Sequence, residues 1–186
     1  MDHRDMKWET LASEYLIERP WLTARRDRVR LPTGIVNSEY YVLEYPDWVN
    51  VIAITKDGEF VFVRQYRYAI GETLYEICAG VVENGEDPLE AAQRELNEET
   101  GYAGGEWEAW LTVSANASAQ TNLTHCFLAR GVEKVSAQRL DATEDIEVYL
   151  FSEEEVFRLL KNNEIKQALM AAPLWKYIAE KGVRCF

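Results

Sequence analysis

The segment from Asp87 to Thr100 constrains the fold most, because it carries signals for both ends of one helix. Asp87 is placed to cap the N-terminus, Pro88 follows at the first helical position, and Glu90 completes a capping-box pattern. Gly101 stands where a left-handed glycine ends many helices. Apolar residues recur between these ends at helical spacing. The sequence therefore predicts a single helix with defined boundaries.

Short β-branched and aromatic runs on both sides of this helix predict strands. They are residues 29–31, 40–43, 48–54, 60–63 and 74–78 before the helix, and 110–113, 124–129 and 146–151 after it. Asp57-Gly58 between two of these runs is a strong hairpin signal. Further helices are expected over 152–160, which opens with a capping box, over 166–172, and from Pro173 onward. Strands mixed with a few helices predict an α/β or α+β sandwich.

The predicted helix places several carboxylates close together. Glu95 and Glu99 lie one turn apart on the same face, where two like charges destabilise a helix by roughly 0.2–0.5 kcal/mol. A cation would relieve this repulsion, and Mg²⁺ prefers hard carboxylate oxygens together with water and substrate phosphates. Arg94 is spaced to pair with the neighbouring Glu98. The alternative is a solvated acidic face, but such a face needs no glycines at fixed positions around it.

The segment from Gly80 to Tyr102 resembles the Nudix box. The residues in register with that motif are Gly80, Glu86, Arg94, Glu95, Leu96, Glu98, Glu99 and Gly101, and Tyr102 stands where an aliphatic residue is usual. The resemblance implies a Nudix-type α/β/α sandwich with a mixed sheet. It also implies hydrolysis of a nucleoside diphosphate linked to another group, with Mg²⁺ or Mn²⁺ assisting the attack of water on phosphorus.

The resemblance also assigns roles by position. Glu95 and Glu99 would be metal ligands, with the backbone carbonyl of Ala79 as a further one. Glu98 would be a ligand or would help to deprotonate the water. Arg94 and Glu86 would be structural, tying the loop to the helix.

Outside the box, the chain looks most similar to the ADP-ribose pyrophosphatase branch, which includes nucleotide-sugar hydrolases. The run from Arg64 to Arg67 and the following strand carry this likeness, so Arg67 would contact the diphosphate or terminal sugar and Glu76 would line the pocket. The alternative for Arg67 is an ordinary charge at a strand end. The acidic loop 141–147 is similar to one that supplies a general base, with Glu144 as the best match and Asp145 next, although it can also be read as a solvated loop.

The region Ser114–Asn122 departs from the pattern of the ADP-ribose pyrophosphatase branch, because it lacks the proline of the Ser-Pro-Gly-type motif that is common there.

The leading interpretation is a Mg²⁺-dependent hydrolase of an ADP-ribose-like nucleotide sugar, which releases a nucleoside monophosphate and a sugar phosphate. The alternatives are a Nudix enzyme for GDP-mannose or dinucleoside polyphosphates, or a sensor that binds ADP-ribose without cleaving it. The sensor is disfavoured because the box keeps every carboxylate.

The first part of the chain reads as an appended arm. Residues 1–45 are expected to form strands, and residues 46–186 the Nudix domain. Members of this branch often form homodimers by exchanging an N-terminal arm. The residues expected at such an interface are Trp8, Tyr15, Trp21, Tyr40 and Tyr41.

Charge and cysteine content exclude several other classes. The chain has 20 Lys and Arg against 32 Asp and Glu, a net charge of -12, which disfavours general binding to nucleic acid or to anionic membranes. No apolar run is long enough for a membrane span. Cys78, Cys126 and Cys185 are isolated, so a disulfide scaffold or a structural zinc site is not expected, and the cytoplasm is the expected compartment.

Overall fold

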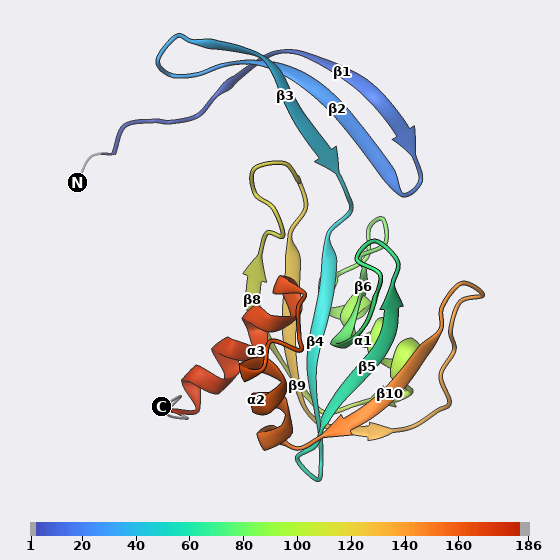
Figure 1. The fold of residues 1–186 in the computed structure, drawn as a ribbon. Helices are drawn as coiled ribbons and strands as arrows, with labels where there is room; N and C mark the ends of the chain where they lie inside the picture. Colours follow the sequence, from blue (N-terminus) through green and yellow to red (C-terminus); the bar gives the residue numbers. More distant parts are fainter. Residues whose placement is uncertain (1–2, 183–186) are drawn as a thin grey trace. The chain divides into compact units, whose positions relative to one another are not determined.

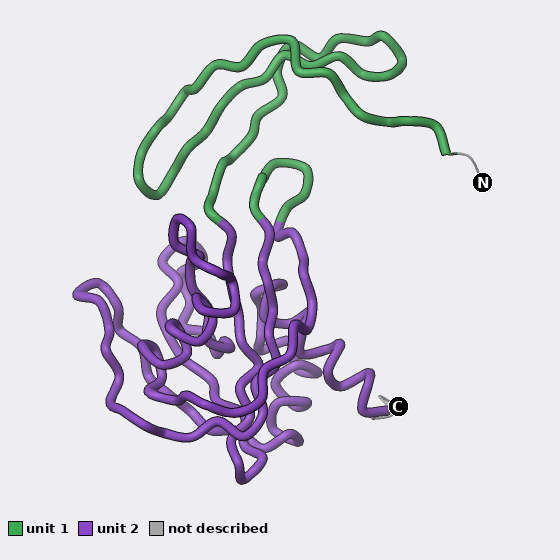
Figure 2. The backbone as a smooth tube through the Cα atoms, turned by 180° about the vertical axis from the view of Figure 1, so that it is seen from behind, with its two compact units in different colours: residues 1–46, 116–122 green, residues 47–115, 123–186 purple. Residues whose placement is uncertain are grey.

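The computed structural model describes residues 3–182. Its contacts divide the chain into two compact units, drawn in different colours in Figure 2. The first comprises residues 1–46 and 116–122, and the second comprises residues 47–115 and 123–186. Cys185 lies outside the described residues.

The first unit is a three-stranded antiparallel sheet. Its strands, in spatial order, are β1 (Glu9–Arg19), β2 (Leu22–Arg30) and β3 (Val36–Glu44). The loop 116–122 belongs to this unit because Leu43 donates its N–H to the Ala119 carbonyl at 2.7 Å. Parts of β2 and β3 were predicted individually, whereas β1 was expected only as part of an arm of strands over residues 1–45.

The second unit is built on a seven-stranded mixed sheet. Its strands are β4 (Trp48–Thr55), β5 (Phe60–Arg67), β6 (Glu72–Val81), β7 (Tyr102–Ala103), β8 (Glu106–Val113), β9 (Thr124–Lys134) and β10 (Ile146–Phe151). The order is β10-β5-β6-β4-β9-β7, with β8 also paired to β9. The central pair β4 and β9 is parallel, while the other pairings are antiparallel. The expected mixed sheet is confirmed.

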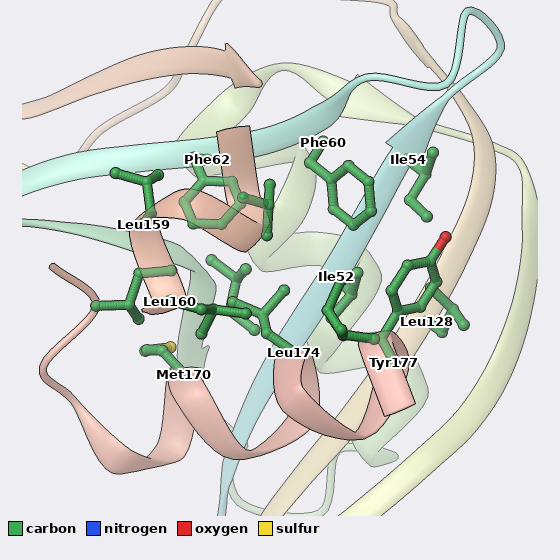
Figure 3. Close-up of a cluster of buried hydrophobic side chains, with 14 of the residues drawn as sticks. Ile52, Ile54, Phe60, Phe62, Leu128, Leu159, Leu160, Met170, Leu174 and Tyr177 are labelled. Carbon is green, nitrogen blue, oxygen red and sulfur yellow. The ribbon is translucent and has the colours of Figure 1, made fainter. Parts of the chain in front are cut away.

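Helices cover both faces of this sheet, as Figure 1 shows. Successive strand residues point to opposite faces, so Ile52 and Ile54 of β4 join one core cluster while Val51 and Ala53 join another. The first cluster packs against α2 (Glu153–Lys161) and α3 (Ala168–Glu180), and the second against α1 (Pro88–Thr100). Figure 3 shows the first cluster, in which strand side chains meet helix side chains. Those labelled there are Ile52, Ile54, Phe60, Phe62, Leu128, Leu159, Leu160, Met170, Leu174 and Tyr177. The expected α/β/α sandwich is thereby confirmed.

The ends of α1 lie where the sequence predicts them, although Asp87 caps the helix without the expected capping-box bond from Glu90. The Asp87 side chain accepts the Leu89 N–H at 2.8 Å, and Pro88 occupies the first turn. Gly101 has a φ of 74° and donates its N–H to the Asn97 carbonyl at 2.8 Å. A Cβ atom at Gly101 would also collide with the Ser136 carbonyl, so both conformation and space require glycine.

The C-terminal helices confirm one expectation and correct another. The capping box formed by Ser152 and Glu155 opens α2 as expected. The predicted helix break at Pro173 is wrong, because α3 runs continuously through this residue. Pro173 cannot donate to the Leu169 carbonyl one turn earlier, and the Asn50 side chain donates to that carbonyl instead, at 2.7 Å. Among the described residues, no helix is both long and apolar enough to cross a membrane.

Candidate active site

A pocket of about 310 Å³ lies in the second unit and collects residues from most of its elements. Its lining residues from the strands are Trp48, Val49, Asn50, Gln65, Arg67, Ala79, Gly80, Val81 and Thr124. The others come from α1, the loop before β10 and the start of α3, and are Glu99, Glu144, Gln167, Leu169 and Met170. Four of the predicted site residues, Arg67, Ala79, Glu99 and Glu144, therefore meet in one cavity of a size typical for small ligands.

Arg94 holds the carboxylates of the box in place. Its guanidinium donates to both oxygens of Glu86, at 2.9 and 3.0 Å, and to the Val81 carbonyl at 3.0 Å. It also donates to Glu95 at 2.8 Å and to Glu98 at 3.2 Å. These bonds join the loop before α1 to the helix, and the hydrogen bonds from Arg94 to Glu86 lower the pKa of that carboxyl.

Gly80 permits a close approach between β6 and α1. A Cβ atom at this position would overlap the carboxyl group of Glu95. The Glu95 side chain is mostly buried, and this burial raises its pKa although Arg94 opposes the shift. The box glycine therefore matters for space and not for conformation: no positive φ is recorded for it, and a Cβ atom there would force the Glu95 side chain to move.

Glu99 is the buried carboxylate of the pocket. It is 5% exposed and accepts the Ala79 N–H at 3.2 Å. Burial raises its pKa to about 7, and the negative charges of Glu95 and Glu144 act in the same direction. The neighbouring Cys78 is fully buried, which raises its thiol pKa. Cys126 is buried too, which raises the pKa of its thiol to about 11.

The carboxylate oxygens of this site suit a divalent cation. Within residues 3–182, no three acidic, histidine or cysteine side chains are already gathered into a metal site. Mg²⁺ nevertheless commonly binds through one or two carboxylates and takes its remaining ligands from water and substrate phosphates. A cation would favour ionised Glu99 and offset the repulsion from Glu95 and Glu144.

Arg67 and Glu76 form an ion pair beside the pocket. Arg67 donates from Nε and Nη2 to the two carboxylate oxygens of Glu76, at 2.9 and 2.5 Å. Glu76 is 1% exposed, whereas the Arg67 side chain is 39% exposed. Glu76 lines a second cavity that shares Arg67 and Gln167 with the first. Glu76 therefore orients Arg67, and part of the guanidinium stays accessible.

The two candidate general bases have different surroundings. Glu144 lines the pocket and accepts the Asp141 N–H at 2.8 Å, which closes a turn in the acidic loop. Glu98 is not among the lining residues, and its carboxylate pairs with Arg94 at 3.2 Å and with Arg139 at 4.0 Å. Glu95 and Asp145 are likewise outside the lining.

Sequence reasoning missed the polar wall of the pocket. Asn50 on β4, Thr124 on β9 and Gln167 before α3 contribute to it. Asn50 and Thr124 are almost completely buried. A polar residue within an apolar strand run is the one available signal, and Asn50 in Trp48–Ile54 has it.

Comparison with known proteins agrees with this geometry. The family model described as the NUDIX domain matches residues 44–172. The model described as the nucleoside diphosphate sugar hydrolase N-terminal domain matches residues 8–43. Together they account for both units of the chain.

Individual relatives match over most of the chain. The chain is 32% identical over 158 residues to the methanol dehydrogenase activator of Bacillus methanolicus, covering 84% of this chain and 85% of that protein. It is 30% identical over 169 residues to the ADP-ribose pyrophosphatase of Bacillus subtilis (strain 168), covering 90% of this chain and 91% of that protein. A crystal structure of an ADP compounds hydrolase matches with a TM-score of 0.83 at 19% identity, covering 97% of this chain and 99% of that one. This structural match shows the fold.

Proposed function

The chain belongs to the Nudix hydrolase family, and on that premise we propose that it hydrolyses the diphosphate of an ADP-ribose-like nucleotide sugar with Mg²⁺ as cofactor. The enzyme is a Nudix pyrophosphohydrolase of the ADP-ribose or sugar-nucleotide type. The products would be a nucleoside monophosphate and a sugar phosphate. The convergence of Arg67, Glu99 and Glu144 on one pocket is the observation that carries this proposal.

Each of these groups suits one part of the reaction. Arg67 would bind diphosphate oxygens with the N–H groups that Glu76 leaves free, because a guanidinium matches phosphate geometry. Glu95, Glu99 and the Ala79 carbonyl would hold Mg²⁺, which would neutralise the diphosphate and acidify a bound water. The water oxygen would form a bond to one phosphorus while the bridging P–O bond breaks.

Glu144 is the better candidate to accept the proton of the attacking water. It lines the pocket, whereas the Glu98 carboxylate is held by two arginines away from the lining. A loop carboxylate can close over bound substrate and accept a proton. Glu98 would then serve to position Arg94.

A substrate panel tests the proposal. Phosphate release would be followed with a coupled phosphatase for ADP-ribose, ADP-glucose, GDP-mannose, UDP-glucose, NADH and diadenosine polyphosphates, with and without Mg²⁺. We expect hydrolysis of a nucleotide sugar that requires the metal and is lost in Glu99→Gln. Full activity of Glu99→Gln would contradict the metal assignment, and a preference for dinucleoside polyphosphates would contradict the substrate class. Tight binding without cleavage would identify a sensor.

We also propose that the first unit mediates homodimer formation. Tyr15, Leu16 and Ile17 are consecutive in β1, where a register shift with β2 interrupts the regular pairing, and all three are exposed, as is Trp21. Exposed apolar surface of this kind often marks an interface. Light scattering should give the dimer mass for the full chain and the monomer mass for Leu16→Glu. Val135→Glu, at an exposed apolar position of the second unit, is the matched control.

A further inference from the structure

The last turn of α1 is bonded to the segment 139–145, which leads into β10 and carries Glu144. A helix leaves its final carbonyl groups without helical partners, so other groups must satisfy them. The Glu98 carbonyl accepts the backbone N–H of Arg139 at 2.9 Å. The Glu99 carbonyl accepts a bond from Nε2 of Gln138 at 2.7 Å. The end of the carboxylate helix therefore holds the start of this segment.

The Gln138 side chain also holds the other end of the segment. Its Nε2 atom donates a second bond to the Ile146 carbonyl, at 3.0 Å, where β10 begins. An amide nitrogen has two hydrogens, so these two carbonyls use both of its donors. Turning the amide over would place its oxygen against two carbonyl oxygens, which fixes its orientation. One half-buried side chain thus closes the segment into a loop against α1.

This bridge relates the positions of two carboxylates in the pocket. Glu99 reaches the pocket from α1, and Glu144 reaches it from the bridged segment, two residues before Ile146. The turn that contains Glu144 is closed by its own bonds. Its N–H donates to the Asp141 carbonyl at 3.0 Å, and its carboxylate accepts the Asp141 N–H at 2.8 Å. Gln138 therefore sets the distance between a formed turn and the helix end.

We propose that Gln138 is a positioning residue, which anchors the segment 139–145 to α1 and so holds Glu144 in place for proton transfer. This inference rests on the proposed hydrolase function and adds a residue outside the pocket lining to it. A general base must lie within hydrogen-bond reach of the attacking water, so a shift of its segment slows the chemical step. Substrate binding through Arg67 does not depend on the bridge.

Gln138→Glu is the most informative variant. It keeps the size of the side chain but replaces the two donors with oxygens that face two carbonyl oxygens. The kcat for ADP-ribose should fall roughly tenfold to hundredfold, which is part of what a general base contributes, while KM stays nearly unchanged. Gln138→Ala removes the amide without adding charge and should lower kcat less. It also keeps the test available if the glutamate variant does not fold.

A double variant shows whether Gln138 acts through Glu144. Glu144→Gln removes the base, so adding Gln138→Glu to it should cause no further loss of kcat. The Mg²⁺ concentration that gives half the maximal rate should not change in Gln138→Glu, because Gln138 contacts the backbone of Glu99 and not its carboxylate. Multiplied losses in the double variant, or a raised Mg²⁺ requirement, would overturn positioning of Glu144.

Two further variants serve as controls. Gln138→Lys retains a nitrogen that can donate to both carbonyls, so it should restore most of the kcat lost in Gln138→Ala. Gln93→Glu adds the same charge at an exposed position of α1 and should leave kcat and the melting temperature unchanged. No recovery in Gln138→Lys, or an equal loss in Gln93→Glu, would contradict the role of the two donated bonds.

Hydrogen exchange measures the anchor without any substrate. In Gln138→Glu, the backbone amides of 139–145 should exchange faster than in the wild type, while those of α1 keep their protection. Equal exchange, or an unchanged kcat, would overturn the inference while leaving hydrolysis intact. If the wild type cleaves none of the compounds tested, the proposed function fails and exchange alone judges the anchor. Faster exchange in the variant would then support it, and equal exchange would overturn it.

Discussion

The Nδ2 atom of Asn50 lies 2.7 Å from the carbonyl oxygen of Leu169 and replaces the hydrogen bond that Pro173 removes from α3. A proline inside a helix leaves the carbonyl one turn earlier without its N–H partner. The buried strand residue Asn50 supplies that donor from the sheet. This bond connects β4 to the start of α3, where the pocket wall is formed.

A double-mutant cycle tests this replacement. Asn50→Ala should lower the free energy of unfolding by about 1–3 kcal/mol, because the Leu169 carbonyl is left buried without a donor. In a Pro173→Ala background, the new backbone N–H can donate to the same carbonyl, so the same substitution should cost less. Urea unfolding of the four proteins gives the coupling energy. Equal costs in both backgrounds would show that the two residues act independently.

The same relationship explains where the sequence prediction went wrong in the helices. The ends of α1 were predictable because Asp87, Pro88 and Gly101 carry local signals within one segment. Continuity of α3 through Pro173 depends on Asn50, which is separated from Leu169 by 119 positions in the sequence. No local sequence pattern reveals that a side chain so distant in the chain replaces the missing backbone hydrogen bond.

The position of strand β1 and the pocket wall escaped prediction for related reasons. Every β1 residue except Leu11 is exposed, so the segment lacks the alternation that marks a half-buried strand. Its cross-strand ion pairs join Glu9 to Arg30 and Glu14 to Arg26, and both depend on the register with β2. The box carboxylates lie within one helical segment, whereas Asn50, Thr124 and Gln167 come together through folding.

The overlap that a side chain at position 80 would create leads to a second prediction. Gly80→Ala should lower the free energy of unfolding by about 1–3 kcal/mol and strongly reduce hydrolysis, because the Glu95 carboxyl must move. Adding Glu95→Ala should restore stability by removing the overlapping group, but it should not restore activity. Chemical unfolding and initial rates for both proteins check this. A fully active Gly80→Ala enzyme would show that the close approach is dispensable.

A third prediction concerns the ion pair between Arg67 and Glu76. Arg67→Ala leaves the Glu76 carboxylate buried without its partner, so the free energy of unfolding should fall by roughly 2–3 kcal/mol. Arg67→Ala combined with Glu76→Gln should recover most of this loss, because the remaining group is neutral. KM for the nucleotide sugar should remain raised in both proteins. A normal KM in the double variant would place substrate binding elsewhere.

The fourth prediction follows from the raised pKa of Glu99. Its ordinary pKa is 4.5, and burial raises the value to about 7 in the folded protein. Between these values the folded protein keeps a proton that the unfolded chain has lost. The free energy of unfolding of the metal-free protein should therefore decrease as pH rises from 4.5 to 7, by up to roughly 3 kcal/mol in total.

Glu99→Gln removes this titration, because glutamine stays neutral and can still accept the Ala79 N–H. In EDTA, the variant should be more stable than the wild type at pH 8, and the two should converge near pH 4.5. Mg²⁺ should stabilise the wild type at pH 8, since it binds the ionised carboxylate, but it should have little effect on the variant. Urea unfolding across this pH range, with the exposed Glu154→Gln as matched control, measures both effects. The same pH dependence in wild type and Glu99→Gln would mean that Glu99 does not carry the shift.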